Sequence, residues 1–212
     1  MKYDILWENI KHVKITSLLD IGCHVGNFTN TFKSHLSLDP SKILCMDINT
    51  EYEKRILSLG YRFIGAGVGA EKKIVSVYYP LKPLHLYDPR NMGVSYYREN
   101  TDFFKDCTIS DQTIYPLDDL ILDEIFDFIK IDVQGAEYDV IFGGQKTISK
   151  TKCLLVEVST GNYNLGCKKE QETIELLNSM GFVQKAVVDE FFRDRKMEQR
   201  DILFLNEKGD LN

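Results

Sequence analysis

Three acidic residues, Asp20, Asp47 and Asp132, stand at the ends of short apolar segments of this sequence. Such segments, separated by helical patterns, predict buried parallel strands, and ligands of these sheets bind beyond the carboxyl ends of the strands. Gly22 and Gly26 follow Asp20 and permit backbone conformations that other residues resist. We expect the Asp20 carboxylate to point into that crevice, where it suits a ligand with positive charge or hydrogen-bond donors and suits a pyrophosphate poorly.

The first turn reads DIGCHVG over residues 20–26. A lone Gly-x-x-x-Gly indicates only an α/β domain with a tight first turn. A dinucleotide fingerprint requires Gly-x-Gly-x-x-Gly, and His24 stands where its second glycine would be. The pattern Asp-x-Gly-x-x-x-Gly instead resembles motif I of class I methyltransferases that use S-adenosylmethionine. The resemblance implies that Asp20, Gly22, His24 and Gly26 bind this cofactor.

The second apolar segment, 42–48, carries Asp47 near its end, in the region where a carboxylate holds ribose hydroxyls in nucleotide-binding sheets. Alternatively, Asp47 is a solvated residue at the strand end or a cap for the next helix. We assign Ile48, Gly67 and Val68 to the same cofactor-binding set. The last two belong to a predicted third strand, 61–70, whose glycines let the backbone pass close to a neighbour or a flat ring. An edge bulge without function would give the same pattern.

A fourth apolar segment reads FDFIKIDVQGAE over residues 126–137, with charged residues at its exit. Asp132 is the first candidate to position or deprotonate an acceptor, and the alternative is a structural carboxylate that orders the loop or the cofactor. Glu137 is the second candidate, and Lys130 is placed to orient or neutralise one of them. Glu157 lies inside the next apolar segment, 153–159, where an unpaired carboxylate would cost several kcal/mol. We therefore expect Glu157 to form a structural ion pair with Lys130.

The elements that must position these residues fit one α/β domain over residues 1–212. Apolar segments alternate with helical patterns and end in two strand-like runs, 182–188 and 201–206, on either side of a charged loop, 190–200. This alternation predicts a doubly wound, Rossmann-like sheet of seven strands in the order 3-2-1-4-5-7-6 with the last strand antiparallel.

One region, residues 71–115, departs from the strand–helix rhythm. It contains two extended segments, 74–79 and 93–97, and between Tyr78 and Tyr97 it is rich in proline and tyrosine. A stiff loop with tyrosine hydroxyls suits a polyhydroxylated acceptor such as a sugar, and we expect this insertion to cover the acceptor site. A surface hairpin that packs its own tyrosines is the alternative. His85 lies in this loop, although a lone loop histidine is rarely a proton acceptor.

Composition excludes several classes of protein. The 212 residues carry a formal net charge of −6 without a basic block, which argues against nucleic acid as a partner. Five cysteines without a Cys-x-x-Cys pair predict reduced thiols, no zinc site and a cytoplasmic location. We assign no metal-binding residues, and a requirement for a divalent metal is left open. We find no signal-peptide core and no apolar run of membrane-spanning length. The oligomeric state is left open.

The fourth segment, together with PLDDL at 116–120, resembles the signature of the FkbM family of methyltransferases. The first turn and LVE at 155–157 keep the family's order and approximate spacing. The chain departs from the family pattern at two places. It has Cys23-His24 where the family commonly has Ala-Asn, and Asp47 where the family usually has Glu followed by Pro. Both changes keep the required chemistry. The resemblance covers about 17–160 and implies a class I methyltransferase fold, S-adenosylmethionine as cofactor, and methyl transfer to a hydroxyl of a sugar or secondary metabolite.

Two other functions remain to be separated from methyl transfer. A methyltransferase-like binding module without catalysis would be expected to lose Asp20, Gly22 or Asp47, and all three are present. A nicotinamide-dependent oxidoreductase would need the phosphate-binding glycine fingerprint, which is missing. We therefore expect an enzyme that acts on a small-molecule or glycan acceptor.

Overall fold

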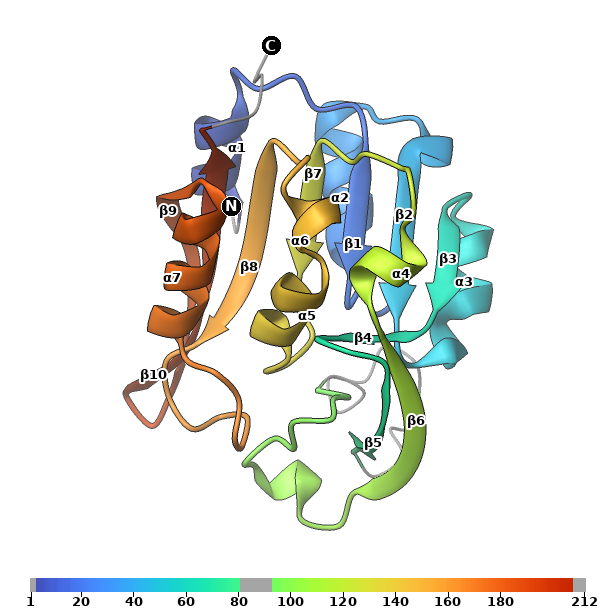
Figure 1. Ribbon diagram of the computed structural model, residues 1–212, viewed down its shortest axis with the longest axis vertical. Coiled ribbons are helices and arrows are strands. Elements are labelled where there is room, and N and C mark those ends of the chain that lie inside the picture. The colour runs from blue at the N-terminus through green and yellow to red at the C-terminus, as the bar shows by residue number, and fades with distance from the viewer. Residues whose placement is uncertain (1–2, 81–92, 208–212) are drawn as a thin grey trace.

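A seven-stranded sheet forms the middle layer of the protein in the computed structural model, which describes residues 3–80 and 93–207 (Figure 1). Its order in chain numbering is β3-β2-β1-β7-β8-β10-β9, and β10 runs antiparallel to both of its neighbours. This differs from the expected 3-2-1-4-5-7-6 because three strands of a second sheet intervene in the chain, and without them the two orders correspond. The strands are β1 (Leu18–Ile21), β2 (Ile43–Asp47), β3 (Arg62–Gly65), β7 (Phe128–Ile131), β8 (Cys153–Ser159), β9 (Phe182–Arg193) and β10 (Lys196–Asn206).

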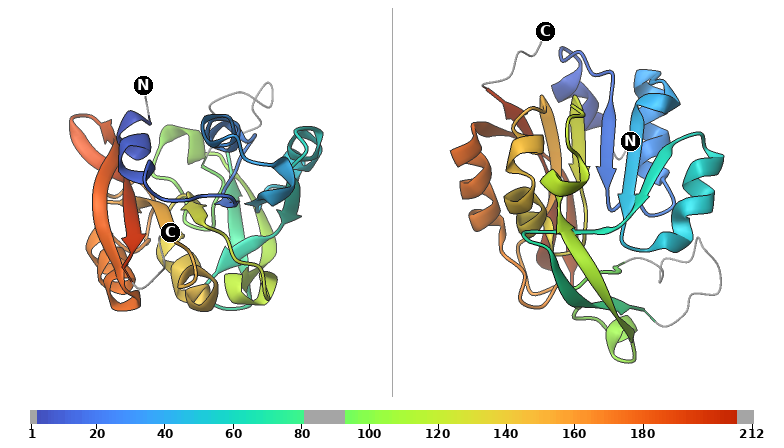
Figure 2. Two further views of the ribbon diagram at one scale, coloured as in Figure 1. Left: turned by 90° about the horizontal axis from the view of Figure 1, so that it is seen from above. Right: turned by 45° about the vertical axis from the view of Figure 1, so that its right-hand side comes forward.

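Helices cover both faces of this sheet, as two views of the ribbon show (Figure 2). Successive residues of β1 face opposite sides: Leu18 packs with the first three helices and Leu19 with the last four. The first group is α1 (Asp4–Ile10), α2 (Asn27–Leu36) and α3 (Glu53–Ser58). The second is α4 (Leu117–Leu120), α5 (Glu137–Gly143), α6 (Gln145–Ile148) and α7 (Glu170–Met180). Among the described residues, we find no helix with the length and apolar character needed to cross a membrane.

A second, three-stranded sheet lies beyond the carboxyl ends of the parallel strands (Figure 1). Its order is β4-β6-β5, formed by β4 (Gly67–Gly69), β5 (Lys73–Tyr79) and β6 (Thr108–Pro116). The expected single strand 61–70 was wrong, because the chain leaves the large sheet after Gly65 and pairs with β6 from Gly67. The expected strand 93–97 is reduced to one bridge between Ser95 and Tyr78. Residues 81–92 of the predicted insertion, including His85, lie outside the described residues.

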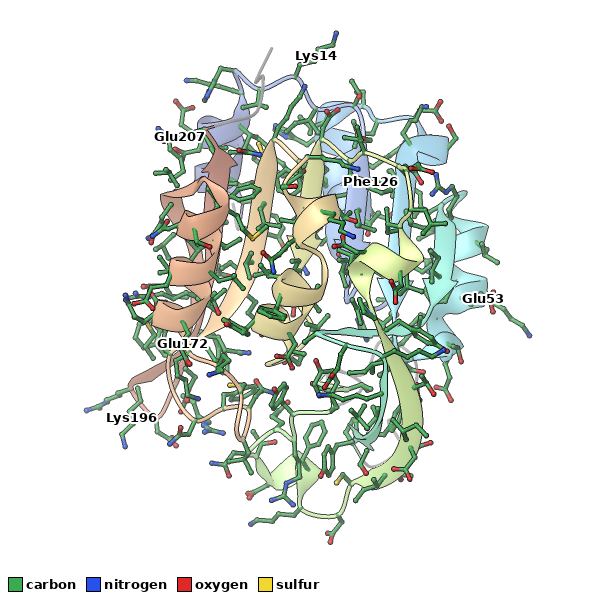
Figure 3. The ribbon with its side chains drawn as sticks, in the orientation of Figure 1. Lys14, Glu53, Phe126, Glu172, Lys196 and Glu207 are labelled. Carbon is green, nitrogen blue, oxygen red and sulfur yellow. The ribbon has the colours of Figure 1, made fainter. Side chains whose placement is uncertain are left out.

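The last two strands form a long hairpin where the sequence predicted a charged loop. Pairing continues from Phe182–Asn206 to Arg193–Lys196, and the turn consists of Asp194 and Arg195, which have φ of 50° and 64°. Figure 3 shows Lys196 at the far end of this hairpin, projecting from the molecule. The prediction of a loop at 190–200 was therefore wrong, and the hairpin extends beside the carboxyl end of β8.

Candidate active site

The turn after β1 depends on a glycine. Gly22 has φ of 79°, and its N–H donates to the carbonyl oxygen of Met46 at 2.8 Å. A Cβ atom at Gly22 would lie 1.7 Å from the carbonyl oxygen of Asp132, so the turn packs directly against the exit of β7. Gly26, with φ of 82°, precedes α2 and lies behind the cavity that Gly22 helps to line. The glycines thus shape the first turn, and only Gly22 borders the cavity.

Asp47 joins two backbone segments at the end of β2. Its two carboxylate oxygens accept hydrogen bonds from the N–H groups of His24 and Asn49, at 2.9 and 2.8 Å. Asp47 is 9% exposed and lines the cavity, and burial raises the pKa of its carboxyl to about 6 although both N–H groups oppose the shift. A carboxylate has about four lone-pair sites, so Asp47 retains acceptor capacity for hydroxyl groups in the cavity.

His24 forms part of the same wall. Its ring meets that of Tyr52 edge to face, with centroids 4.7 Å apart, and burial lowers the pKa of its imidazole. Its Nε2 atom is buried and has no hydrogen-bond partner among residues 3–80 and 93–207. A neutral imidazole with one open acceptor or donor therefore borders the space beside Asp47.

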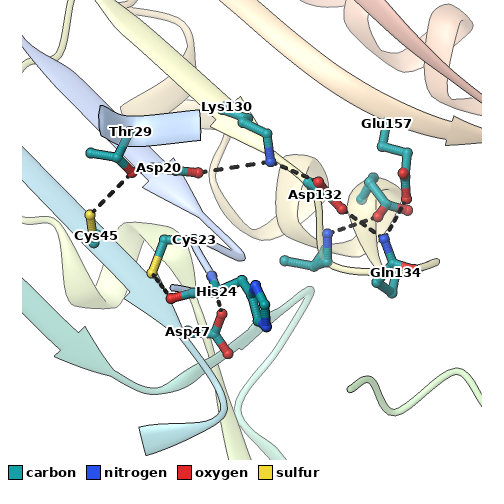
Figure 4. Close-up of polar contacts among 12 residues, drawn as sticks. Asp20, Cys23, His24, Thr29, Cys45, Asp47, Lys130, Asp132, Gln134 and Glu157 are labelled. Atoms are coloured by element: carbon teal, nitrogen blue, oxygen red, sulfur yellow. Dashed lines mark hydrogen bonds and ion pairs between the residues drawn. The ribbon is translucent and has the colours of Figure 1, made fainter. Parts of the chain in front are cut away.

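Asp20 does not point into the cavity, contrary to our expectation. Leu18 and Asp20 share the face of β1 that packs against α2, so the carboxylate is fully buried there and accepts a hydrogen bond from the Thr29 hydroxyl. Its other oxygen lies 3.9 Å from Lys130 Nζ (Figure 4). Burial raises the pKa of the Asp20 carboxyl despite that cation. The strand register thus places Asp20 beneath the site.

The wall opposite the first turn is apolar. Ile48, Gly67 and Val68 all line the cavity, as the sequence suggested. A Cβ atom at Gly67 would lie 2.7 Å from Ile48 Cδ1 and equally close to Ile114 Cγ2, so a glycine is needed for β4 to cross these side chains. The backbone here passes close to neighbouring side chains, and its apolar residues border the cavity.

Lys130 is buried between two carboxylates. Its ammonium donates to Asp132 Oδ2 at 2.8 Å and stands 3.9 Å from Asp20, with the Phe28 ring centroid at 5.3 Å (Figure 4). Burial disfavours the charge on Lys130, but Asp132 and Asp20 outweigh that effect and raise its pKa. Both Lys130 and Asp132 line the cavity. The expected convergence of these two residues is present, and Asp132 carries a cationic partner.

Glu157 makes a different set of contacts from those expected. Its Oε2 atom accepts from the side-chain amides of Gln134 and Gln199, at 2.8 and 2.7 Å, and no ion pair to Lys130 is present. Burial raises the pKa of the Glu157 carboxyl well above its usual range, as do Asp132 and other carboxylates. The predicted ion pair was wrong because Asp132 and Asp20 already surround the ammonium group of Lys130.

Glu137 lies outside the cavity lining. Its carboxylate accepts hydrogen bonds from the N–H groups of Val133 and Gly135 at about 3.0 Å, and it is 4% exposed. Burial raises the pKa of this carboxyl to about 7. Glu137 is close to Asp132 in the sequence, as expected. The Glu137 side chain, however, closes the 133–135 turn and does not face the cavity that Asp132 borders.

One cavity of about 770 Å³ connects these walls. Within the described chain, no three histidine, cysteine or carboxylate side chains gather closely enough to hold a metal ion. The inner end is bordered by 21–25, 46–48 and 66–68, and by Asp132 and Gln134. The outer end is bordered by insertion residues 93–96, 99, 101 and 104, by Tyr163, and by hairpin residues 189–191, 193 and 199–201. The size is within the range of sites for small organic ligands.

Arg193 connects the hairpin to the insertion at this outer end. Its guanidinium donates to the carbonyl oxygen of Asn100 at 2.6 Å and to Glu198 Oε1 at 3.1 Å, and it lies 5.2 Å from the centroid of the Tyr163 ring. Arg193 and Glu198 were not expected at the site, because the charges of residues 190–200 are typical of a solvated loop. Nor were Gln134 and Gln199 expected as the donors that hold Glu157.

Comparisons with known proteins give a consistent result. A family model described as the methyltransferase FkbM domain matches residues 20–184. A comparison with curated protein sequences finds no match. Among solved structures, methyltransferase FkbM from Methylobacillus flagellatus KT is similar, with a TM-score of 0.53 and 16% identity, over 90% of this chain and 43% of that one. The chain therefore spans less than half the length of that protein.

Two further structures share the fold. Magnesium protoporphyrin IX methyltransferase from Synechocystis PCC 6803, with bound SAM, has a TM-score of 0.53 and 10% identity over 96% of this chain and 74% of that one. N-methyltransferase NodS from Bradyrhizobium japonicum WM9 has a TM-score of 0.52 and 13% identity over 95% and 92%. Identities this low speak for the fold alone. The family model, by contrast, covers most of the sequence, from the first turn through Asp47, Asp132 and Glu157, and on this basis the chain belongs to the family of methyltransferase FkbM domains.

Proposed function

We propose that this domain transfers a methyl group from S-adenosylmethionine to a hydroxyl group of an uncharged sugar or a similar polyhydroxylated metabolite. The observation that carries the proposal is the continuity of one cavity from the glycine turn and Asp47 to Asp132 and Glu157. The family assignment supports methyl transfer as the reaction, and the arrangement of the cavity supports the choice of acceptor.

The inner end of the cavity fits the cofactor. Gly22 lets the first turn pack against the Asp132 carbonyl and borders the cavity there, and Asp47 offers unused lone pairs to ribose hydroxyls. Ile48 and Val68, where β4 crosses at Gly67, supply an apolar wall for a flat ring, and His24 borders the same space. S-adenosylmethionine supplies a methyl group on a positively charged sulfur. In this proposal Asp20 and Gly26 shape the turn from behind.

The outer end suits an uncharged, hydroxyl-bearing acceptor. Carboxylates outnumber cationic side chains in the whole cavity lining, with seven against three. All three cations are already engaged, Lys130 with Asp132 and Asp20, Arg193 with Glu198, and Arg200 with Glu170 and Glu190. Carboxylates accept hydrogen bonds from hydroxyl groups and repel phosphate or carboxylate groups. Tyr96 and Tyr163 add aromatic surface of the kind that covers sugar rings.

The side chains provide positioning and a place for the proton. Holding the acceptor oxygen in line with the methyl carbon, about 3 Å away, supplies proximity and orientation. A hydroxyl group must also lose its proton, and Asp132 and Glu157 are the carboxylates next to the junction of the two ends of the cavity. Lys130 fixes the orientation of Asp132, and Glu137 orders the turn that follows it.

Calorimetry tests the cofactor assignment. The protein should bind S-adenosylmethionine and S-adenosylhomocysteine and should not bind NAD measurably. Binding of NAD alone would overturn the proposal in favour of an oxidoreductase.

Turnover tests the reaction. Transfer of a labelled methyl group should be measured against a panel of methyl glycosides of neutral sugars, amino sugars and sugar phosphates. We expect neutral glycosides to be methylated and sugar phosphates to be excluded. Cofactor binding without transfer to any member of the panel would contradict the glycoside acceptor and favour a binding module, and transfer to amino groups alone would identify nitrogen as the acceptor atom.

A further inference from the structure

Two carboxylates of the cavity lining, Asp132 and Glu157, come from the exit of β7 and from the neighbouring strand β8, and their hydrogen-bond partners differ. Asp132 Oδ2 accepts from the Lys130 ammonium, and Asp132 Oδ1 accepts from the amide nitrogen of Gln134, both at 2.8 Å. Each oxygen thus holds a donor, and one donor carries a positive charge. An adjacent cation stabilises the ionised form of a carboxylate, so Asp132 is poorly suited to gain a proton.

Glu157 has neutral donors on one oxygen only. Gln134 and Gln199 both donate to Oε2 through their amide nitrogens, while Oε1 has no hydrogen bond or ion pair to any described residue. Both Glu157 and Gln134 line the cavity, and Figure 4 shows the amide of Gln134 between the two carboxylates. Glu157 therefore presents an open acceptor oxygen, and its hydrogen-bond donors are neutral amides, whereas Asp132 is in direct contact with an ammonium group.

Gln134 is held in place by the backbone. It has φ of 57°, a conformation that is unfavourable for a residue with a Cβ atom, and the next residue is Gly135 with φ of 102°. In this conformation one amide nitrogen reaches Asp132 Oδ1 and Glu157 Oε2. Because both amide hydrogens are used by carboxylates, Gln134 is a positioning residue that sets the orientation of Glu157 relative to Asp132.

We propose that Glu157, and not Asp132, accepts the proton of the acceptor hydroxyl during methyl transfer. This assignment rests on the proposed function. The acceptor oxygen forms a bond to the methyl carbon while the bond from that carbon to sulfur breaks, and the electron pair of the broken bond remains on sulfur. The hydroxyl proton moves to Glu157 Oε1. One positive charge on sulfur and one negative charge on Glu157 disappear together, so charge balances.

The charged and titratable surroundings of Glu157 favour proton uptake. Asp132 follows β7, Asp201 stands opposite Glu157 on β10, Glu137 comes from α5, and Tyr163 lies nearby, while Lys130 is the cation. Burial and the negative groups raise the pKa of Glu157, and Lys130 opposes them only in part. A general base works best when its pKa lies near the working pH, so a carboxyl pKa raised toward neutrality favours this role.

Carbon NMR provides a readout that needs no acceptor. Protein labelled with ¹³C at the glutamate side-chain carboxyl is titrated in the complex with S-adenosylhomocysteine, and Glu157→Gln identifies the signal of Glu157. We expect this signal to titrate above the usual glutamate midpoint of about 4.3. A midpoint at or below that value overturns the assignment, whatever the acceptor is.

Kinetics then test the role in transfer, with the neutral glycoside that the wild type methylates. The rate of the wild type should rise with pH through the midpoint found by NMR. Glu157→Gln should lower kcat by about 10²–10⁴ and remove this rise, while affinity for S-adenosylhomocysteine stays within a few fold. Glu157→Asp should restore the rise at a reduced rate.

Two matched variants separate this role from others. Asp132→Asn should lower kcat because Lys130 loses the closer of its two carboxylate partners, but it should keep the rise with pH. Glu175→Gln alters an exposed glutamate on α7 that bonds to Gln171, and it should behave as the wild type. If Asp132→Asn abolishes the rise and Glu157→Gln keeps it, Asp132 is the proton acceptor and our assignment is wrong. If no glycoside is methylated although the cofactor binds, the proposed acceptor class fails and the NMR titration alone decides on Glu157.

Discussion

Asp47 illustrates how one side chain serves the fold and the site together. Its carboxylate fastens the first turn to the segment after β2 through the N–H groups of His24 and Asn49. The same side chain borders the cavity, at the position where a carboxylate holds ribose hydroxyls in related sheets. Substitutions at Asp47 therefore separate two effects, loss of ligand contacts and loosening of the turn.

Asp47→Ala should weaken binding of S-adenosylmethionine by about 1–3 kcal/mol, the usual cost of a lost hydrogen bond to a charged group. Calorimetry measures the affinity, and thermal unfolding measures the stability. Asp47→Asn serves as the control for shape, because its side-chain oxygen can still accept one backbone N–H. An unchanged affinity with a collapsed melting temperature would make Asp47 purely structural.

Affinity for S-adenosylmethionine should depend on pH through Asp47. The pKa of this carboxyl is raised to about 6 in the free protein, so below pH 6 it is mostly protonated. Ribose hydroxyls donate to the ionised form, and binding must therefore release a proton at low pH. Affinity should rise by up to about 10-fold per pH unit below 6 and level off above it. Calorimetry across this range should give a flat profile for Asp47→Asn, and an equal slope in both proteins would contradict the assignment.

At the scale of elements, the turn after β1 is the most constrained connection. Gly22 lies against the Asp132 carbonyl, and the N–H groups of Gly22 and Cys23 donate to the carbonyl oxygen of Met46 at the end of β2. A change at this glycine would push the β1 turn away from the exit of β7, which carries Asp132 and Gln134. This backbone contact thus fixes the position of the first turn relative to the exit of β7.

Gly22→Ala should destabilise the protein by several kcal/mol, because the new Cβ atom would clash with backbone at 1.7 Å and occupy a left-handed conformation. Gly166→Ala is the matched control. Gly166 has a similar φ of 81° but nothing within 4 Å of the added atom, so only the conformational cost of about 1 kcal/mol remains. Urea unfolding measures the free energy of unfolding of both variants. An equal decrease in the two would show that the close contact of Gly22 with Asp132 does not contribute to stability.

The sequence predicted the elements that have strong periodic patterns and failed where tertiary contacts decide. The order of the large sheet, the Gly22 turn and the approach of Lys130 to Asp132 follow from apolar segments and their polar ends. The direction of Asp20 depends on which face of β1 meets α2, and a strand of four buried residues has no polar alternation to reveal it. The hairpin beyond Val188 is largely exposed, so its strands lack the apolar period that would distinguish them from a charged loop.

At the scale of the whole molecule, distant parts of the chain close the outer end of the cavity together. The hairpin meets the insertion at Arg193 and Asn100, and the segment after β8 joins them through Tyr163, whose carbonyl oxygen accepts from the Asn100 N–H at 2.6 Å. The insertion and the segment after β8 are also joined by the bridge between Glu99 and Asn164, and Arg193 adds the hairpin to this connection. Acceptor binding should be sensitive to this connection, whereas the cofactor end lies on the other side of the β7 exit.

Arg193→Ala should make the amides of residues 99–101 exchange about 10- to 100-fold faster, since hydrogen bonds to charged groups contribute about 1.5–3 kcal/mol. KM for the acceptor should rise, and affinity for S-adenosylmethionine should stay the same. Lys196→Ala, at the exposed end of the same hairpin, is the control and should change neither. Unchanged exchange in Arg193→Ala would mean that the insertion holds its position without the hairpin.

The hairpin also bears on the choice of acceptor. The family model ends at residue 184, yet residues 189–191, 193 and 199–201 border the outer end of the cavity. The hairpin thus borders the cavity from outside the stretch that the family model covers. Under the proposed function, substitutions in the hairpin would alter the surface offered to the acceptor and leave the first turn and Asp47 as they are.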